Sequence, residues 1–265
     1  MQVELKGKLA PAVLVDVDRS LASMDATGTT MSLISYPNPD ILALPPERLD
    51  ALIRKTNEEV LEASARHPGR YGLLASIAMP HVDLALKGIA HALDELHADG
   101  FLLLTSYGNK WLGDPAFQPV LQELNRRKAV VFVHPATADC CRGLIAGLND
   151  SVIEYETDTA RTIASLLFTG SAERFPDIRF IFSHAGGTVP SLVARFENAP
   201  RSSPAVAANI PQGSLAYLRR FHYDVAQASN ESALGALMKF VPADHVHFGT
   251  DFPYMDAAQH VKLLR

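Results

Sequence analysis

Short apolar runs recur along the chain, and each ends at a glycine, a proline or a polar side chain. Runs of this length, bounded by turn residues, are typical of buried parallel strands. The pattern therefore predicts strands over residues 29–36, 71–79, 100–106, 129–134, 178–184, 221–226 and 246–251.

Amphipathic segments separate these runs. The clearest one begins at Pro45-Pro46, where proline suits the first helical turn, and it carries Leu49, Ile53 and Val60 on one side. Helices are predicted over residues 18–28, 45–66, 81–98, 117–128, 157–170, 215–220 and 232–240, with a further helix beginning after Pro190.

The alternation of strands and helices predicts an α/β fold. The strand ends recur roughly every 25 to 50 residues, against ~31 when about 250 residues form eight βα units, which favours a (β/α)8 TIM barrel. A doubly wound open sheet is the alternative, but no GxGxxG motif or P-loop follows any predicted strand. Because the pattern lacks one strand, we expect residues 1–265 to form a single domain without strand 1 and without the C-terminal end of the barrel.

Composition narrows the classes of function. With 48% hydrophobic residues, a net charge of −5 and no run of Lys or Arg, the chain is not expected to bind nucleic acid or a membrane. The apolar segment at residues 9–15 is too short for a membrane span or a convincing signal peptide. The two cysteines, Cys140 and Cys141, are adjacent and cannot form the usual relaxed disulfide, so a reducing cytoplasm is the expected location.

Candidate chemistry gathers at three predicted strand ends. His134, His184 and Asp251 each terminate an apolar run, and the C-terminal ends of barrel strands are where such enzymes carry catalysis. Imidazole and carboxylate together suit a divalent metal ion. The competing interpretations are a hydrogen-bonded structural histidine at either position and a helix-capping role for Asp251.

Other residues near these ends give weaker signals. Gly186 and Gly187 let the backbone turn sharply after His184 and are expected to leave its imidazole uncrowded. Asp224 lies close to a strand end and is as consistent with facing the barrel mouth as with a structural role. His222 and His247 fall inside strands, where packing is the better explanation.

Three segments together resemble a known family. The sequences FVHP at 132–135, SHAGG at 183–187 and GTDFP at 249–253 are similar, in order and spacing, to motifs of the amidohydrolase-related decarboxylases, the family of aminocarboxymuconate-semialdehyde decarboxylase. The stretch 104–115 resembles the methylsalicylate decarboxylase branch of that family. The resemblance extends over nearly the whole chain.

The resemblance implies a TIM barrel of the metal-dependent hydrolase type that holds one divalent ion, zinc as the first expectation and manganese as the second. By position, His134 and Asp251 would be metal ligands, and His184 and Asp251 would be the catalytic residues. Family members also carry a His-x-His or Glu-x-His pair at the end of strand 1, and residues 1–36 contain neither. A site without those two ligands would hold its metal weakly.

The resemblance further implies non-oxidative decarboxylation of a hydroxybenzoate-type or enol-type carboxylic acid. A metal-dependent hydrolase of an amide, ester or lactone is the alternative, because the same fold and ligands serve both reactions. A second alternative is an inactive, truncated barrel without catalytic metal.

Three residues are predicted to contact the substrate. Asn109 and Trp111 lie in the methylsalicylate-like stretch. Arg195 follows His184 by three helical turns, about 16 Å at ~1.5 Å per residue, too far to reach the metal centre of its own subunit. In the family that this chain resembles, an arginine at this position grips the substrate carboxylate across a dimer interface, so a homodimer is expected.

Overall fold

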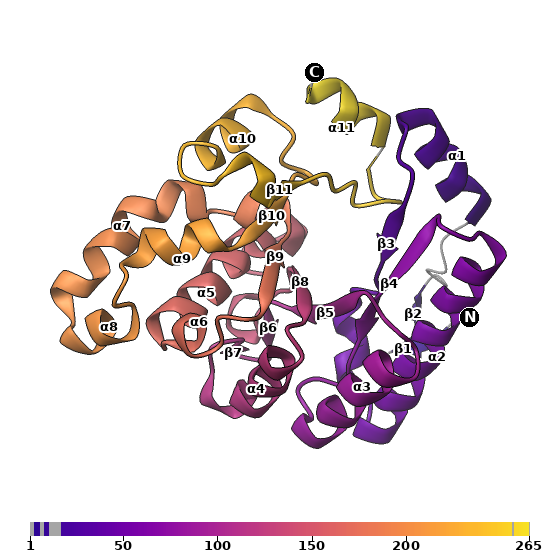
Figure 1. Cartoon of the computed structure of the whole chain (residues 1–265), viewed down its shortest axis with the longest axis horizontal. Helices are drawn as coiled ribbons and strands as arrows, with labels where there is room; N and C mark the ends of the chain where they lie inside the picture. The colour runs from indigo at the N-terminus through magenta and orange to yellow at the C-terminus, as the bar shows by residue number, and fades with distance from the viewer. Residues whose placement is uncertain (1–2, 6–7, 11–16, 256, 265) are drawn as a thin grey trace. The chain divides into compact units, whose positions relative to one another are not determined.

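The computed structural model describes residues 3–5, 8–10, 17–255 and 257–264 of the chain. Two compact units are formed: the first comprises Met1–Leu102 and Thr250–Arg265, and the second Leu103–Gly249 (Figure 1).

The first unit contains three parallel strands in the order β3, β4, β5. Its strands are β3 (Ser32–Ile34), β4 (Tyr71–Ser76) and β5 (Gly100–Leu104), whose last two residues belong to the second unit, and an antiparallel pair, β1 (Val3–Leu5) and β2 (Lys8–Ala10). Its helices are α1 (Val17–Thr27), α2 (Pro46–Arg66), α3 (Val82–Asp94) and α11 (Ala257–Leu263), with a 3₁₀ turn at η1 (Pro39–Ala43).

Burial explains why these segments form strands and helices. Every residue of β4 and β5 is buried, as expected for strands covered on both faces. Helix α2 has Pro46 in its first turn and buries Leu49, Ile53 and Val60, so its apolar stripe faces the core. Leu49 and Ile53 pack in one cluster with Ile41 of η1.

The second unit contains four parallel strands in the order β8, β9, β10, β11. They are β8 (Val130–His134), β9 (Arg179–Phe182), β10 (His222–Asp224) and β11 (Val246–His247), and a separate antiparallel hairpin joins β6 (Ser106–Tyr107) to β7 (Lys110–Trp111). Its helices are α4 (Gln118–Arg126), α5 (Glu154–Phe168), α6 (Ser171–Arg174), α7 (Val189–Ser202), α8 (Pro204–Asn209), α9 (Ser214–Arg220) and α10 (Glu231–Leu237). Short 3₁₀ turns lie at η2 (Pro115–Phe117), η3 (Asp139–Cys141), η4 (Asp150–Val152), η5 (His184–Gly186) and η6 (Ala243–His245).

Three phenylalanines form the centre of this unit. Phe180 and Phe182 of β9 stack on each other, and Phe221 packs edge-on against both at centroid distances of 5.9 and 5.1 Å. All three are buried. Ring contacts of this kind stabilise a core beyond the area they bury, which fixes β9 beside β10.

The seven predicted strands are confirmed, with different ends. Strand β9 ends at Phe182 and β11 at His247, so His184 and Asp251 lie in the turns that follow rather than in the strands. The sequence pattern missed the β1–β2 pair, the β6–β7 hairpin and helices α6, α8 and α11, all of which are short. The apolar segment at 9–15 lies largely outside the described residues, and the single-domain assignment stays a prediction.

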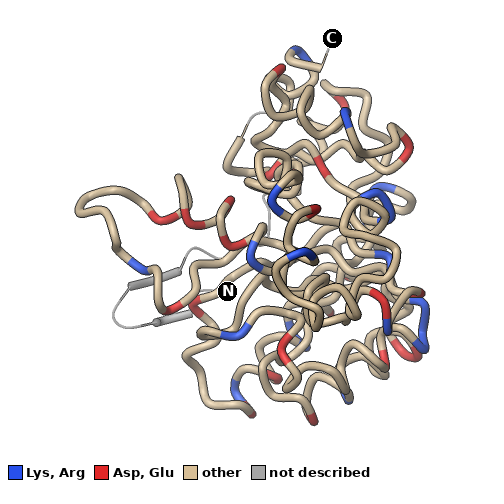
Figure 2. Tube along the Cα trace, turned by 90° about the vertical axis from the view of Figure 1, so that its left-hand side faces the viewer, with Lys and Arg blue, Asp and Glu red and all other residues tan. Residues whose placement is uncertain are grey.

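Charges of both signs are spread along the described chain (Figure 2). No helix in that part of the chain is both long and apolar enough to cross a membrane.

Three histidines of the second unit lie against one another. His222 stacks on His245 and His247 at centroid distances of 4.1 and 5.0 Å, and its Nδ1 is 2.9 Å from His247 Nε2. Burial, then His245, His247 and Arg179, lowers the pKa of His222 to about 4, while Asp244 acts in the opposite direction. The pKa of His247 is lowered for similar reasons. The packing role expected for His222 and His247 therefore fits their surroundings.

This cluster predicts loss of stability in mild acid. Because the folded pKa of His222 lies below the ordinary value of 6.5, the unfolded chain binds protons first as the pH falls. The contribution is fully present above pH 6.5 and is lost between about pH 6.5 and 4. Urea midpoints should fall between pH 7 and pH 5, and less so for His222→Asn. Equal falls in the urea midpoint of the wild type and of His222→Asn would show that His222 does not cause the loss of stability.

Candidate functional site

His134 is the last residue of β8, and its ring orientation is fixed by the turn that follows. Its Nδ1 lies 2.9 Å from the carbonyl oxygen of Pro135. Because a carbonyl only accepts hydrogen bonds, Nδ1 carries the proton, and in the neutral ring Nε2 carries the lone pair. A histidine whose second nitrogen donates to a backbone carbonyl is the usual arrangement of an imidazole metal ligand.

His184 follows β9 in the turn η5 and makes a close contact with a carboxylate. Its Nδ1 lies 3.0 Å from Oε1 of Glu156, which comes from the first turn of α5. The side chain of His184 is 7% exposed and that of Glu156 is 31% exposed. The imidazole is therefore buried and oriented, and the expectation that the glycines leave it uncrowded is wrong.

The backbone at this turn adopts conformations that are rare for side-chain-bearing residues. His184 and Ala185 have φ values of 55° and 56°, in the left-handed region. Gly187 has φ 62° and ψ −127°, and a Cβ there would lie 2.2 Å from the carbonyl oxygen of Glu156. The glycine lets α5 approach the turn, where Thr188 N–H donates to the same oxygen. Strain of this kind clusters at functional sites.

Asp224, at the end of β10, holds the turn from the other side. Its Oδ1 accepts hydrogen bonds from the backbone N–H groups of His184 and Ala226, at 2.9 and 3.0 Å, and the residue is buried. A Cβ on Gly249 would lie 2.7 Å from the Asp224 carboxyl group, so that glycine also permits a close approach. Of the two roles considered for Asp224, these contacts support the structural one.

The structure brings together two of the three residues singled out at strand ends. The rings of His134 and His184 lie 6.1 Å apart, centroid to centroid, at the ends of the paired strands β8 and β9. Asp251 belongs to the first unit, and its φ of 52° lies in the left-handed region. The described residues contain no group of three or more His, Cys, Asp or Glu side chains arranged to hold a metal. The roles predicted for Asp251 stay predictions.

The predicted substrate residues make intramolecular contacts or face solvent. Asn109 Oδ1 accepts from the backbone N–H of Cys140 at 2.7 Å, and Trp111 Nε1 donates to Asp158 at 2.7 Å. Arg195 lies on an exposed part of α7. Contact of these side chains with substrate stays a prediction.

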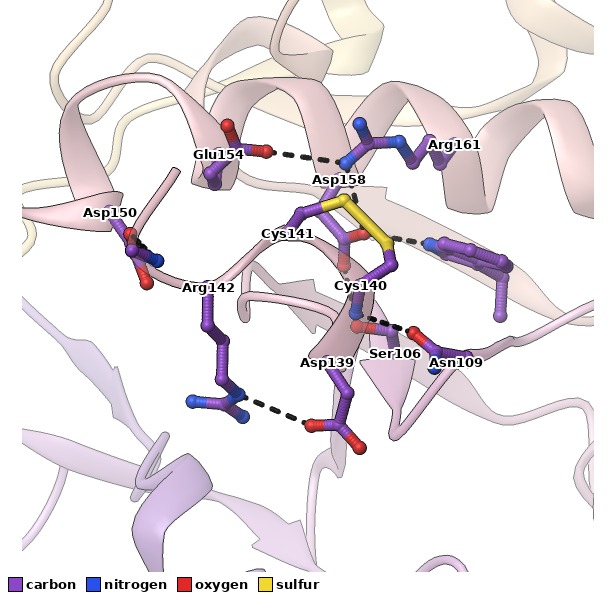
Figure 3. The surroundings of a disulfide bond; sticks show 12 residues. Ser106, Asn109, Asp139, Cys140, Cys141, Arg142, Asp150, Glu154, Asp158 and Arg161 are labelled. Atoms are coloured by element: carbon purple, nitrogen blue, oxygen red, sulfur yellow. Dashed lines mark hydrogen bonds and ion pairs between the residues drawn. A yellow bond between two sulfur atoms is a disulfide. The ribbon is translucent and has the colours of Figure 1, made fainter. Parts of the chain in front are cut away.

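Cys140 and Cys141 form a disulfide in the turn η3, beside Asn109 (Figure 3). The sequence had led us to expect no ordinary disulfide from adjacent cysteines. Residue Cys140 is exposed and residue Cys141 is buried.

Glu156 was missed by the sequence analysis. The predicted helix began at residue 157, whereas α5 begins at Glu154, so Glu156 lay outside the predicted helix. The available signal was the three acidic residues at alternate positions, Glu154, Glu156 and Asp158, because acidic residues favour the first turn of a helix.

Comparison with known proteins gives the family. The family described as Amidohydrolase matches residues 22–264. The 6-methylsalicylic acid decarboxylase acuB of Aspergillus aculeatus is 35% identical over 93% of this chain and 76% of its own length. Decarboxylase yanB of Aspergillus niger is 34% identical over 94% of this chain and 71% of its own length.

The chain belongs to the amidohydrolase family. It is thus an amidohydrolase-related carboxy-lyase or hydrolase, as the motifs around His134, His184 and Asp251 led us to expect. A solved 5-carboxyvanillate decarboxylase from Novosphingobium aromaticivorans, in complex with manganese and 4-hydroxy-3-methoxy-5-nitrobenzoic acid, superimposes with a TM-score of 0.85 at 20% identity, over 94% of this chain and 74% of that one. This likeness confirms the fold class.

Proposed function

We propose that this chain catalyses non-oxidative decarboxylation of a hydroxybenzoate-type acid such as 6-methylsalicylate. The observation that carries the proposal is the contact of the buried His184 with Glu156, beside His134, where the parallel strands β8 and β9 end. The identity of 35% to a 6-methylsalicylic acid decarboxylase supports this choice of substrate class.

His184 is the proton donor in this proposal. Glu156 accepts a hydrogen bond from the Nδ1–H group and its negative charge stabilises the imidazolium, which directs Nε2 toward the substrate. Nε2 gives its proton to the ring carbon that bears the carboxylate. The bond to the carboxylate then breaks, its electron pair restores the aromatic ring, and carbon dioxide leaves. His184 regains a proton from solvent.

The proposal includes a divalent metal ion. Among the described residues, His134 is the one whose geometry supports a role as metal ligand. The Nδ1 contact of His134 with Pro135 leaves Nε2 as the nitrogen suited to ligation. When bound, the metal would withdraw charge from the substrate hydroxyl and carboxylate. Zinc is the first candidate for this metal, and manganese is the second, because the solved 5-carboxyvanillate decarboxylase contains manganese. The proposal includes Asp251 as a further metal ligand and as an alternative proton donor. It also includes a cytoplasmic location.

The test is turnover by the purified chain with manganese or zinc added. Carbon dioxide and the matching phenol should form from 6-methylsalicylate, and chelator should stop the reaction. Turnover of aryl esters or lactones with hydroxybenzoates left intact would favour the hydrolase. Failure with every substrate, in protein that is folded by circular dichroism, would favour the inactive barrel.

Arg195 provides a separate prediction about assembly. If the chain is a dimer and Arg195 grips the carboxylate in its partner's pocket, Arg195→Ala should raise KM about 10- to 100-fold, because a charged hydrogen bond contributes ~1.5–3 kcal/mol. Metal content should not change. Arg201→Ala removes another exposed arginine from α7 and is the control. Unchanged kinetics, or a monomer by light scattering, would return Arg195 to the solvated surface.

A further inference from the structure

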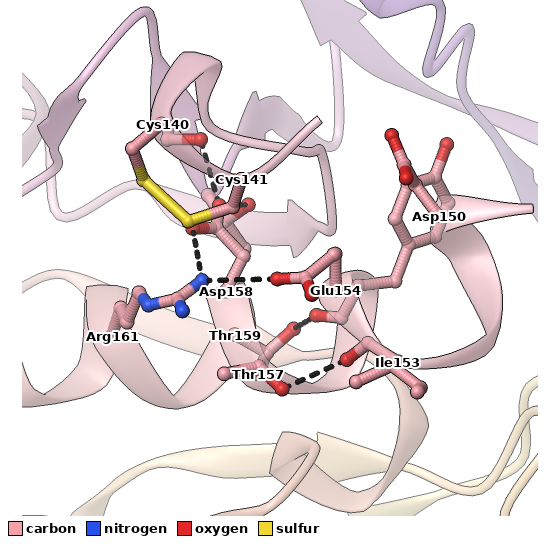
Figure 4. Close-up of polar contacts among 12 residues, drawn as sticks. Cys140, Cys141, Asp150, Ile153, Glu154, Thr157, Asp158, Thr159 and Arg161 are labelled. Carbon is pink, nitrogen blue, oxygen red and sulfur yellow. Dashed lines mark hydrogen bonds and ion pairs between the residues drawn. A yellow bond between two sulfur atoms is a disulfide. The ribbon is translucent and has the colours of Figure 1, made fainter. Parts of the chain in front are cut away.

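Asp158, on α5, has no exposed surface and accepts three side-chain hydrogen bonds. Its Oδ2 accepts from the hydroxyls of Thr105 and Ser106 at 2.6 and 2.7 Å, and its Oδ1 accepts from Trp111 Nε1 at 2.7 Å. Arg161 lies 3.8 Å from Oδ1 and also contacts Glu154 (Figure 4). A buried carboxyl group with this many partners holds several segments at once.

The first segment that it holds is the turn after β8. Thr105, also without exposed surface, donates its backbone N–H to the carbonyl oxygen of His134 at 3.0 Å. Its hydroxyl accepts from the backbone N–H of Ala136 at 2.9 Å while donating to Asp158. Thr105 therefore fixes the peptide groups on both sides of Pro135, and Asp158 fixes the hydroxyl of Thr105.

The second segment is the β6–β7 hairpin. Each strand has two residues, and a hairpin this short is marginal without outside contacts. Helix α5 supplies them: Asp158 binds the Trp111 indole, Thr162 Oγ1 accepts from Leu112 N–H at 3.3 Å, and Ser165 Oγ accepts from Gly113 N–H at 3.1 Å. Residues 158, 162 and 165 lie on one face of a helix, since side chains three and four apart are neighbours.

We propose that Asp158 is a positioning residue that fixes two parts of the site together: the His134–Pro135 turn through Thr105, and the hairpin that carries Asn109 and Trp111. The proposal rests on the proposed function only in one respect, which is that His134 acts as a metal ligand and the hairpin contacts the substrate. The hydrogen bonds themselves are independent of the reaction. Asp158 acts on the site through two arms, and each arm can be weakened separately.

Three substitutions separate the arms. Thr105→Val keeps the shape of the side chain and removes the link to Ala136. Trp111→Phe removes the indole donor but leaves the Ser106 hydroxyl of the hairpin bonded to Asp158, so it weakens the hairpin arm. Asp158→Ala removes both arms. Asp158→Asn is the conservative rescue, because its amide oxygen can still accept from Trp111. Thr56→Val is the matched control, since Thr56 is also buried but its hydroxyl donates only within α2.

Two readouts do not require turnover. Trp111 is the one tryptophan in the sequence, so its fluorescence reports directly on this contact. Asp158→Ala should shift the emission to longer wavelength and increase quenching by acrylamide, with recovery in Asp158→Asn and no change in Thr105→Val. The His134 ring signal in ¹⁵N-histidine NMR spectra, assigned by its loss in His134→Asn, should move in Thr105→Val and Asp158→Ala but not in Thr56→Val.

In active protein, Thr105→Val should lower kcat and Trp111→Phe should raise KM, each lowering kcat/KM about 10- to 100-fold, as for partners that orient ligand side chains. Unchanged fluorescence and histidine signals in folded Asp158→Ala would overturn the inference. If instead the wild type shows no turnover while both signals respond as expected, the proposed function fails and the positioning role of Asp158 stands.

Discussion

Replacing His184 by asparagine is expected to reduce kcat for hydroxybenzoate decarboxylation by about 10²- to 10⁴-fold, the usual effect of losing a positioned proton donor. Asparagine preserves a polar side chain of moderate size but does not transfer a proton. The backbone N–H of residue 184 would still donate to Asp224, so the turn should persist. Initial rates at saturating substrate, with metal content measured on the same samples, test this expectation.

Glu156→Gln provides the graded comparison for His184→Asn. The amide oxygen of glutamine can accept the Nδ1 hydrogen bond, but it lacks the negative charge that stabilises imidazolium, so a smaller loss of kcat is expected. His67→Asn serves as the control, because His67 lies far along the sequence from His184 and Glu156. If His184→Asn retains more than about a tenth of the wild-type kcat, His184 is not the proton donor, and Asp251 becomes the candidate for that role.

Strands β4 and β5 were predictable because burial on both faces leaves a direct record in the sequence. Strands β4 and β5 are buried at every position and read as continuous apolar runs. Helix α2 was equally clear, because proline marks its start and leucine, isoleucine and valine recur on one face. The β6–β7 hairpin left no such record, since each strand has two residues and its position depends on contacts with α5.

The site was predictable only in part. His134 and His184 stood out because each ends an apolar run, and the structure brings their rings together. Glu156, Asp158 and Thr105 could not be found in the same way. Their roles come from contacts between residues far apart in the sequence, such as the Thr105–Asp158 hydrogen bond, and no local pattern encodes them.

The second large effect is expected from Gly187→Ala, which should lower the free energy of unfolding by about 2–6 kcal/mol. Two costs combine. The backbone angles of Gly187, φ 62° and ψ −127°, suit glycine alone and would strain alanine by ~1–3 kcal/mol. The new Cβ would also lie 2.2 Å from the Glu156 carbonyl oxygen, and relieving such overpacking typically costs a further ~1–3 kcal/mol. Urea unfolding curves at pH 7 measure the sum.

Gly213→Ala separates these two costs. Gly213 has φ 80° and ψ 150°, which also suit glycine, but a Cβ there meets nothing within 4 Å. Gly213→Ala should therefore lose only the stability that corresponds to the strained backbone angles. Alanine also lowers the conformational entropy of the unfolded chain, and this effect is the same in both variants. A further difference is expected in activity. Relieving the clash at Gly187 must move α5 away from the turn, which lengthens the His184–Glu156 contact, so kcat should fall for Gly187→Ala and not for Gly213→Ala. Equal losses of stability in the two variants would mean that the clash with α5 adds nothing to the loss of stability. Retained kcat in Gly187→Ala would mean that the contact with Glu156 does not assist proton transfer from His184.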